Sequence, residues 1–133
     1  NQQNKGENVK KAIRISTTGE ITELDLTTNS LAQLQEAVGG LVQALDLTEV
    51  VTMWCNEEGK MYGQPHNPYA QYFWDKVYGQ HTDYMVGDIV LTGGTDSNGE
   101  TQGLTESQTE TLEWLAFQVR DWVEPSIKVF VGE

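Results

Sequence analysis

The chain has 133 residues, of which 38% are hydrophobic and 21% are charged, and this composition is typical of one globular domain rather than of a disordered chain. Its 20 acidic and 8 basic residues give a formal net charge of −12, and such a field repels the phosphates of DNA and RNA. Direct nucleic-acid binding is therefore not expected. No apolar run is long enough to span a membrane and no signal peptide is visible, so the sequence predicts a cytoplasmic protein without membrane contact.

The N-terminal segment 1–10 is polar and predicts a flexible tail, which leaves 11–133 as a single domain. Two runs of alternating apolar and polar residues follow, at 12–16 and at 20–26. The short segment between them contains Gly19, and glycine is common in the tight turns of β-hairpins. These residues predict the first hairpin of the fold.

The segment NSLAQLQEAVGG predicts a helix, with Ser30 as its N-cap and Gln33 completing a capping box. Gly39 and Gly40 can be interpreted in two ways. They can lie inside a longer helix, at a cost of roughly 2 kcal/mol relative to two alanines, or they can end the helix. The second interpretation is favoured, and it places a strand directly after the glycines.

Strands are expected at 41–47 and at 49–56, and the second of them is rich in β-branched and aromatic residues. It ends in Asn-Glu-Glu-Gly at 56–59, a sequence that suits a tight turn. We therefore expect a second hairpin, in which 60–63 returns along the strand that precedes the turn.

The segment 67–79 predicts a short helix that ends at Gly79. Asn67 is its expected N-cap, and Pro68 occupies the first helical position. Its apolar stripe consists of Tyr69, Phe73 and Val77, with Tyr72 beside them. The segment 84–94 then predicts a central strand, because it is apolar on both faces near its middle.

After a flexible loop, the segment 104–123 predicts the longest helix, with a capping box between Thr105 and Gln108. Pro125 is expected to end this helix, and a last edge strand is expected at 126–132. The apolar stripe of the helix consists of Leu112, Leu115, Ala116, Val119, Trp122 and Val123. Together the elements predict an α+β domain, with a mostly antiparallel sheet of about five or six strands and three helices packed against it.

Cys55, His66 and His81 are the residues that most suggest catalysis or metal binding. Cys55 lies among apolar neighbours in a predicted strand, few bases surround it, and the two histidines are spaced too widely for a typical metal site. The adjacent Glu57 and Glu58 do not form an acid–base pair by adjacency alone, because neighbouring side chains of an extended chain diverge. The sequence therefore predicts a protein that is not an enzyme and has no cofactor or metal site.

Aromatic residues are dense between 54 and 78, and a short helix can bury only about half of its circumference. Some of these side chains are therefore expected at the surface, where tyrosine and tryptophan often contact proteins or small molecules. The candidate binding surface consists of Trp54, Asn56, Glu57, Glu58, Lys60, Tyr62, Asn67, Tyr69, Tyr72 and Trp74.

Five short patterns occur in order along the chain: LQEAVGG, NEEGK, an asparagine soon afterwards, VGDIVLTG and LTE. Over roughly residues 12–108, this combination resembles a family of small uncharacterised proteins from tailed bacteriophages and bacterial mobile elements. Members of that family often have Asn-Arg where this chain has Asn67-Pro68, so any ligand role of that arginine is lost or moved here. The resemblance implies an auxiliary role inside an infected bacterium and supplies no catalytic residues.

The expected function is therefore that of a non-enzymatic accessory protein, which acts by binding a host or phage protein. One alternative is a small-molecule or nucleotide-binding module, in which aromatic side chains stack on a base. Another alternative is an acidic mimic of DNA that inhibits a nucleic-acid-binding protein.

Overall fold

The computed structural model describes residues 9–130, with side chains described as far as Val123. The predicted tail at 1–10 thus lies mostly outside the described residues. The strands are β1 (Lys11–Ile15), β2 (Ile21–Asp25), β3 (Val42–Thr48), β4 (Val51–Asn56) and β5 (Ile89–Gly93). The helices are α1 (Ser30–Val38), α2 (Pro68–Tyr78) and α3 (Glu106–Phe130).

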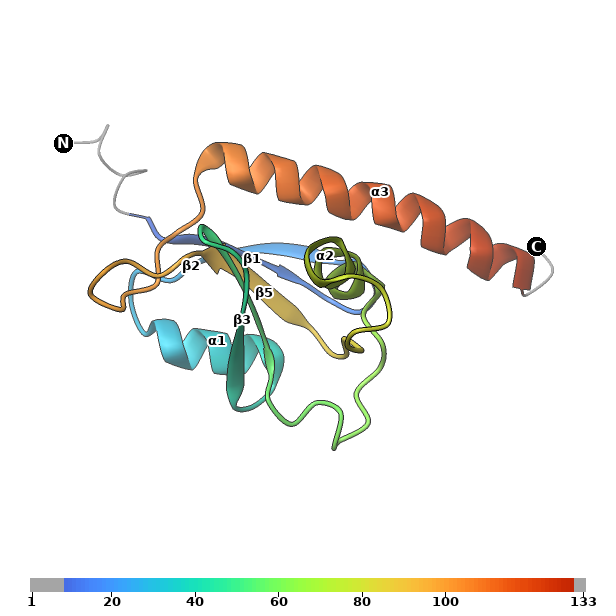
Figure 1. Ribbon diagram of the computed structural model, residues 1–133, viewed down its shortest axis with the longest axis horizontal. Coiled ribbons are helices and arrows are strands. Elements are labelled where there is room, and N and C mark those ends of the chain that lie inside the picture. The colour runs from blue at the N-terminus through green and yellow to red at the C-terminus, as the bar shows by residue number, and fades with distance from the viewer. Residues whose placement is uncertain (1–8, 131–133) are drawn as a thin grey trace.

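The five strands form one sheet in the order β2-β1-β5-β4-β3, and each neighbouring pair is antiparallel. Helix α1 lies on one face of this sheet, whereas α2 and α3 lie on the other (Figure 1). The predicted α+β class, with an antiparallel sheet and three helices, is confirmed.

Two hydrophobic cores result, because successive side chains of a strand point to opposite faces of the sheet. In β5, Val90 packs with α1, whereas Ile89 and Leu91 pack with α2 and α3, and all three are fully buried. Burial on both faces explains the apolar run of this strand and confirms its predicted central position.

The first hairpin is confirmed, with Ile15 paired to Ile21 across its turn. Gly19 in this turn has φ +90°, a conformation that glycine adopts without steric cost. A Cβ atom at Gly19 would also collide with the ring of Tyr69, so the turn lies close against α2. The hairpin is therefore tied to the helix on its face of the sheet.

The second hairpin does not form at the predicted turn. Strand β4 pairs with β3 on one edge, through the short connection at Glu49 and Val50, and with β5 on its other edge. Both edges of β4 are occupied, so residues 60–63 have no edge left to pair with. They follow β4 as a series of turns outside the sheet.

The N-terminus of α1 also differs from the prediction. Asn29 is the N-cap residue, with left-handed φ and ψ of 53° and 43° and no capping hydrogen bond from its side chain. Gln33 does not complete a capping box with Ser30, because its Nε2 donates to the backbone oxygens of Asp25 and Thr28 at 2.8 and 2.7 Å. The predicted end of the helix is confirmed by Gly39, which has φ +83°.

Helix α3 begins as predicted and ends later. Gln108 Oε1 accepts from the Thr105 amide at 2.8 Å, and Thr105 Oγ1 accepts from the Gln108 amide at 3.0 Å, so the capping box is confirmed. The helix then continues through Pro125 to Phe130, and it replaces the edge strand expected at 126–132 as far as the structure describes those residues. Proline removes one helical hydrogen bond, but its fixed φ is compatible with a helix.

Candidate functional site

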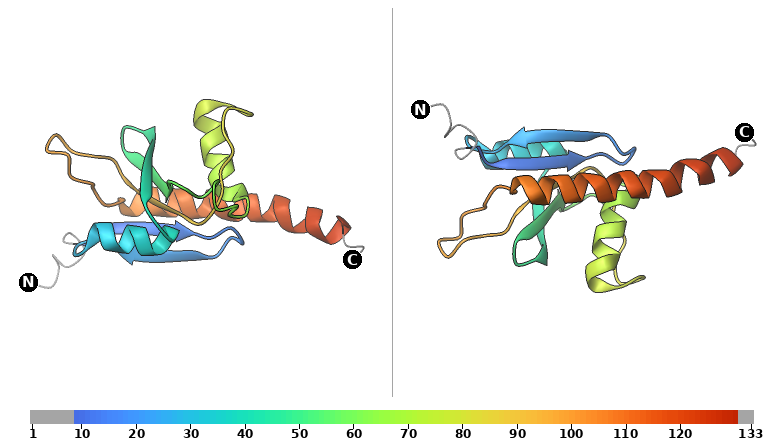
Figure 2. Two further views of the ribbon diagram at one scale, coloured as in Figure 1. Left: turned by 90° about the horizontal axis from the view of Figure 1, so that it is seen from below. Right: turned by 90° about the horizontal axis from the view of Figure 1, so that it is seen from above.

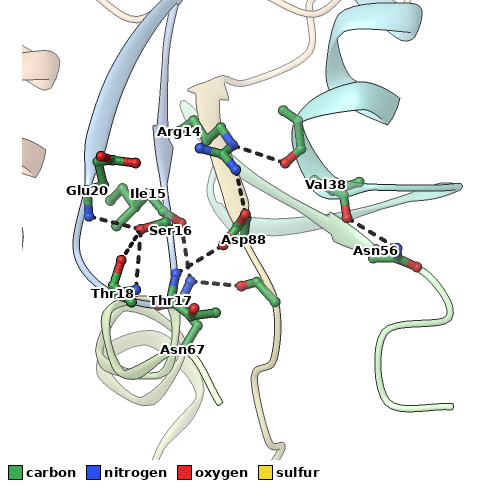
Figure 3. A network of polar contacts seen from close by, with 12 residues as sticks. Arg14, Ile15, Ser16, Thr17, Thr18, Glu20, Val38, Asn56, Asn67 and Asp88 are labelled. Atoms are coloured by element: carbon green, nitrogen blue, oxygen red, sulfur yellow. Dashed lines mark hydrogen bonds and ion pairs between the residues drawn. The ribbon is translucent and has the colours of Figure 1, made fainter. Parts of the chain in front are cut away.

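Asn67 is fully buried, so it cannot belong to a binding surface as predicted. Its Oδ1 accepts from the amides of Tyr69 and Ala70 at 3.0 Å, which confirms the predicted N-cap of α2. Its Nδ2 donates to the backbone oxygens of Ile15 and Gly87 at 3.2 and 2.8 Å (Figure 3). The side chain thus joins the start of α2 to the end of β1 and to the turn before β5.

Asn56 is also buried and connects two elements in a similar way. Its Nδ2 donates to the backbone oxygen of Val38 at the end of α1 at 3.2 Å, and its Oδ1 accepts from the Glu58 amide at 2.7 Å. A Cβ atom at Gly40 would lie 2.9 Å from Asn56 Nδ2. The second glycine of the VGG pattern therefore leaves room for this asparagine, and Asn56 is a structural residue rather than part of a surface.

Arg14 and Asp88 complete the same network. Arg14 Nη2 donates to Asp88 Oδ2 at 2.5 Å, and Arg14 Nε donates to the backbone oxygen of Ala37 at 3.1 Å. The second carboxylate oxygen of Asp88 accepts from the Thr17 amide at 3.0 Å (Figure 3). The guanidinium and the carboxylate both have internal partners, so the ion pair holds the end of α1 against β1 and β5.

The side chain of Gln64 occupies the space that a Cβ atom would need at two further glycines. A Cβ atom at Gly59 would lie 2.7 Å from Gln64 Oε1, and a Cβ atom at Gly87 would lie even closer. Gln64 Oε1 is buried without a hydrogen-bond partner. The glycines of the NEEGK and VGD patterns thus make space for one side chain, and the patterns from LQEAVGG to VGDIVLTG meet at one end of the sheet as a structural network.

Trp54 and Tyr69 cannot lie on one binding surface. Trp54 packs on the α1 face of the sheet, where its Nε1 donates to Thr92 Oγ1 at 2.9 Å. Tyr69 lies on the opposite face and is only 2% exposed. The predicted surface is therefore wrong for Tyr69, which belongs to the core, and the half-buried Trp54 lies on the other face of the sheet.

The remaining α2 residues of the predicted surface are half-buried. Trp74 donates from Nε1 to Thr82 Oγ1 at 2.8 Å and contacts the Tyr78 ring, with ring centroids 4.2 Å apart and the ring planes tilted by 32°. Tyr72 contacts Trp122 of α3, with ring centroids 5.6 Å apart. These side chains mainly hold α2 against its neighbours and leave only part of each ring to solvent.

The turn after β4 presents the rest of the predicted surface. Glu57, Lys60 and Tyr62 are exposed there, and Glu58 is half-buried. Lys60 Nζ forms an ion pair with Asp83, which ties the turn to the segment before β5. The turn after β4 projects from the body of the domain (Figure 1).

Beside this turn lies an open pocket with a volume of about 610 Å³. The rings of His66 and Tyr84 line it and stack on each other at a centroid distance of 4.7 Å. Asp75 and Asp83 also line the pocket, so its charge disfavours phosphate groups. The two aromatic rings were not predicted as a pair, because their contact depends on how the chain returns from α2 to β5.

Cys55 is not activated as a nucleophile. Burial, assisted by the nearby carboxylate of Asp83, raises the pKa of the Cys55 thiol to about 11. The thiol is therefore protonated at neutral pH, and the thiolate is the reactive form. Within the part of the chain that the structure describes, His, Cys, Asp and Glu side chains do not gather in a group of three that could hold a metal ion.

Helix α3 carries an aromatic surface that the sequence did not predict. Trp114 is 57% exposed and Phe117 is 48% exposed, and both point away from the core formed by Leu112 and Ala116. Trp122, which belongs to the predicted apolar stripe, is exposed as well. A sequence signal existed, since Trp114 and Phe117 fall outside the apolar stripe at a spacing of three residues.

We call the line of Glu110, Trp114, Phe117 and Asp121 the outer stripe of α3. All four side chains are exposed. Figure 2 shows α3 lying across the sheet as the outermost element of its face. Within the described residues, no other helix or strand covers the outer side of α3 in these views.

The fold and these surfaces define an α+β domain with an antiparallel sheet, a polar network at one end and an exposed aromatic stripe on its longest helix. Among the described residues, no helix is both long and apolar enough to cross a membrane. The chain belongs to the family described as a domain of unknown function (DUF3846), which matches residues 10–116. Comparisons with curated proteins and with solved structures give no match.

Proposed function

We propose that the protein is a non-enzymatic accessory protein of a bacteriophage or mobile element. It acts in the cytoplasm of the infected bacterium by binding a host or phage protein. The resemblance of its sequence patterns supports the phage setting. The exposed pair of Trp114 and Phe117 on α3 is the observation that supports protein binding.

Exposed apolar side chains contribute binding free energy when a partner covers them. Burying a large apolar side chain stabilises a structure or a complex by about 1.5–3 kcal/mol, and aromatic residues dominate the binding energy of many interfaces. Trp114 and Phe117 gain only part of this stabilisation within the domain, because both remain about half exposed. A partner that covers the outer stripe would bury both rings at once.

Affinity capture from a lysate of infected cells tests this function. The wild-type protein should recover a specific partner, and a Trp114→Ala/Phe117→Ala variant should lose it. Leu31→Ala is a matched control, since Leu31 is 57% exposed on α1 at the opposite face of the sheet. The control should recover the partner as the wild-type protein does.

Two results would contradict the proposal. One is the absence of any specific partner at both low and moderate salt. The other is equal recovery by the wild-type protein and by the Trp114→Ala/Phe117→Ala variant, which would place the interface elsewhere.

The pocket beside His66 and Tyr84 supports a second candidate function, the binding of a small aromatic molecule. A flat ligand could stack on the exposed ring of Tyr84. A thermal-shift screen with nucleosides and nucleotides tests this, because a ligand at 100 times its dissociation constant adds about 2.7 kcal/mol of stability. A stabilisation that is lost in Tyr84→Ala would favour this function over protein binding.

A further inference from the structure

The outer stripe of α3 has the spacing of a helix–helix contact. Its members Glu110, Trp114, Phe117 and Asp121 follow one another at intervals of four, three and four residues. At 3.6 residues per turn they lie within an arc of about 60°, and they cover about 16 Å of the helix axis. The alternation of four and three is the pattern by which one helix packs along another.

The outer stripe carries a carboxylate at each end. Glu110 and Asp121 flank the two aromatic rings, and both carboxylates are exposed. The nearest base along the helix is Arg120, whose Nη2 donates to the backbone oxygen of Gly19. The Arg120 guanidinium also lies over the Phe117 ring, with Cζ 5.2 Å from the ring centroid. One positive charge therefore borders the middle of the stripe, and the two carboxylates at its ends leave the stripe with a net negative charge.

A second copy of the chain is a poor occupant of this stripe. In a parallel pair of α3 helices, Glu110 would face Glu110 of the other copy and Asp121 would face Asp121. In an antiparallel pair, Glu110 would face Asp121 at both ends. Each arrangement brings like charges together, and like charges across an interface disfavour the complex.

We infer that the outer stripe binds a basic amphipathic helix of a partner protein. This inference rests on the proposed function and names the kind of partner. The helix carries two apolar residues that pack on Trp114 and Phe117, with a lysine or arginine on either side at the same 4-3-4 spacing. Because this spacing is symmetric, the helix can present its bases to Glu110 and Asp121 in either direction.

A synthetic peptide of about 15 residues, long enough for four helical turns, tests the inference with the full-length protein. The basic peptide has lysines at the two outer positions of the 4-3-4 pattern and leucines at the two inner ones. A matched acidic peptide has glutamates in place of the lysines. Calorimetry at low salt should show binding of the basic peptide and none of the acidic peptide.

Two double variants separate the contribution of the apolar side chains to peptide binding from the contribution of the charges. Trp114→Ala/Phe117→Ala should weaken binding of the basic peptide about thirtyfold or more, as removal of an interface hot spot does. Glu110→Lys/Asp121→Lys should weaken it about fivefold through the loss of two exposed ion pairs, and it should now bind the acidic peptide. Leu31→Ala should bind as the wild-type protein does. An unchanged melting temperature shows that each variant is folded.

Three results would overturn the inference. They are equal binding of the two peptides, binding that is insensitive to both double variants, and self-association of the wild-type protein in sedimentation that Trp114→Ala/Phe117→Ala abolishes. The two proposals fail in different ways. Suppose that the captured partner is lost with Trp114→Ala/Phe117→Ala but the two peptides bind equally. The proposed protein binding is then supported, and the inference of a basic helix is contradicted. If capture of the partner is insensitive to Trp114→Ala/Phe117→Ala, the proposed function itself is contradicted.

Discussion

Helices α2 and α3 lie on the same face of the sheet, yet they place their aromatic side chains differently. Tyr69 and Phe73 of α2 are buried in the core, whereas Trp114 and Phe117 of α3 are about half exposed. Helix α2 contacts both α3 and the edge strand β3, but α3 is the outermost element of its face (Figure 2). The position of a helix in the layers therefore decides whether its aromatic residues stabilise the fold or remain available to a partner.

The largest expected effect is at Tyr69. Tyr69→Ala should lower the free energy of unfolding by about 4 kcal/mol, because it leaves a cavity in the core. Urea denaturation followed by circular dichroism measures this. Tyr62→Ala is the matched control, since Tyr62 is 67% exposed, and it should change stability by less than about 0.5 kcal/mol. Equal losses in the two variants would contradict the assignment of Tyr69 to the core.

Asn67→Ala should have the next largest effect, a loss of about 3 kcal/mol. It removes the N-cap of α2 and leaves the buried backbone oxygens of Ile15 and Gly87 without this donor. Urea denaturation measures the loss, and Asn98→Ala in the exposed loop after β5 serves as the control. If the free energy of unfolding falls by only about 1 kcal/mol, Asn67 stabilises the protein as an N-cap alone, and its connection to β1 and β5 contributes little.

Thr105→Ala should lower the free energy of unfolding by about 1 kcal/mol, through loss of the capping hydrogen bond to the Gln108 amide. Thermal unfolding should show the decrease as a lower midpoint. Thr111→Ala, at an exposed position inside the same helix, should not lower the midpoint, because alanine is the better helix former. A lower midpoint for Thr111→Ala alone would show that the cap does not limit the stability of α3.

The smallest expected effect is at the outer stripe. Trp114→Ala/Phe117→Ala should change the free energy of unfolding by less than about 0.5 kcal/mol per substitution, because exposed positions contribute little to the fold. The same urea titration measures it. A loss of several kcal/mol would mean that these rings stabilise the domain itself, and the contrast between α2 and α3 would disappear.

Local features of the chain were predictable because their contacts are near in sequence. The capping box of Thr105 and Gln108 joins residues three apart, and Asn67 caps amides two and three residues ahead. Gly39 ends α1 through its own backbone conformation. Each of these contacts depends on the residue types at short, fixed spacings, so it could be predicted without knowledge of the fold.

Strand pairing was predicted less well, because the edges of a strand are filled by segments far apart in sequence. β4 takes β5 as a neighbour, with Met53 paired to Leu91, and this leaves no edge for residues 60–63. The second function of Asn67 depends on the same distant pairing, since Ile15 and Gly87 reach it from two other elements. The candidate surface was therefore predicted as one patch, although Trp54 and Tyr69 lie on opposite faces of the sheet.

We could predict the α+β class, the positions of most helices and strands, and the acidic charge from the residues alone, because periodicity, capping residues and composition are properties of local segments. Which polar and aromatic residues are buried could not be predicted in this way. Burial depends on what covers a side chain, and the elements that cover Asn67 or leave Trp114 open come from distant parts of the chain.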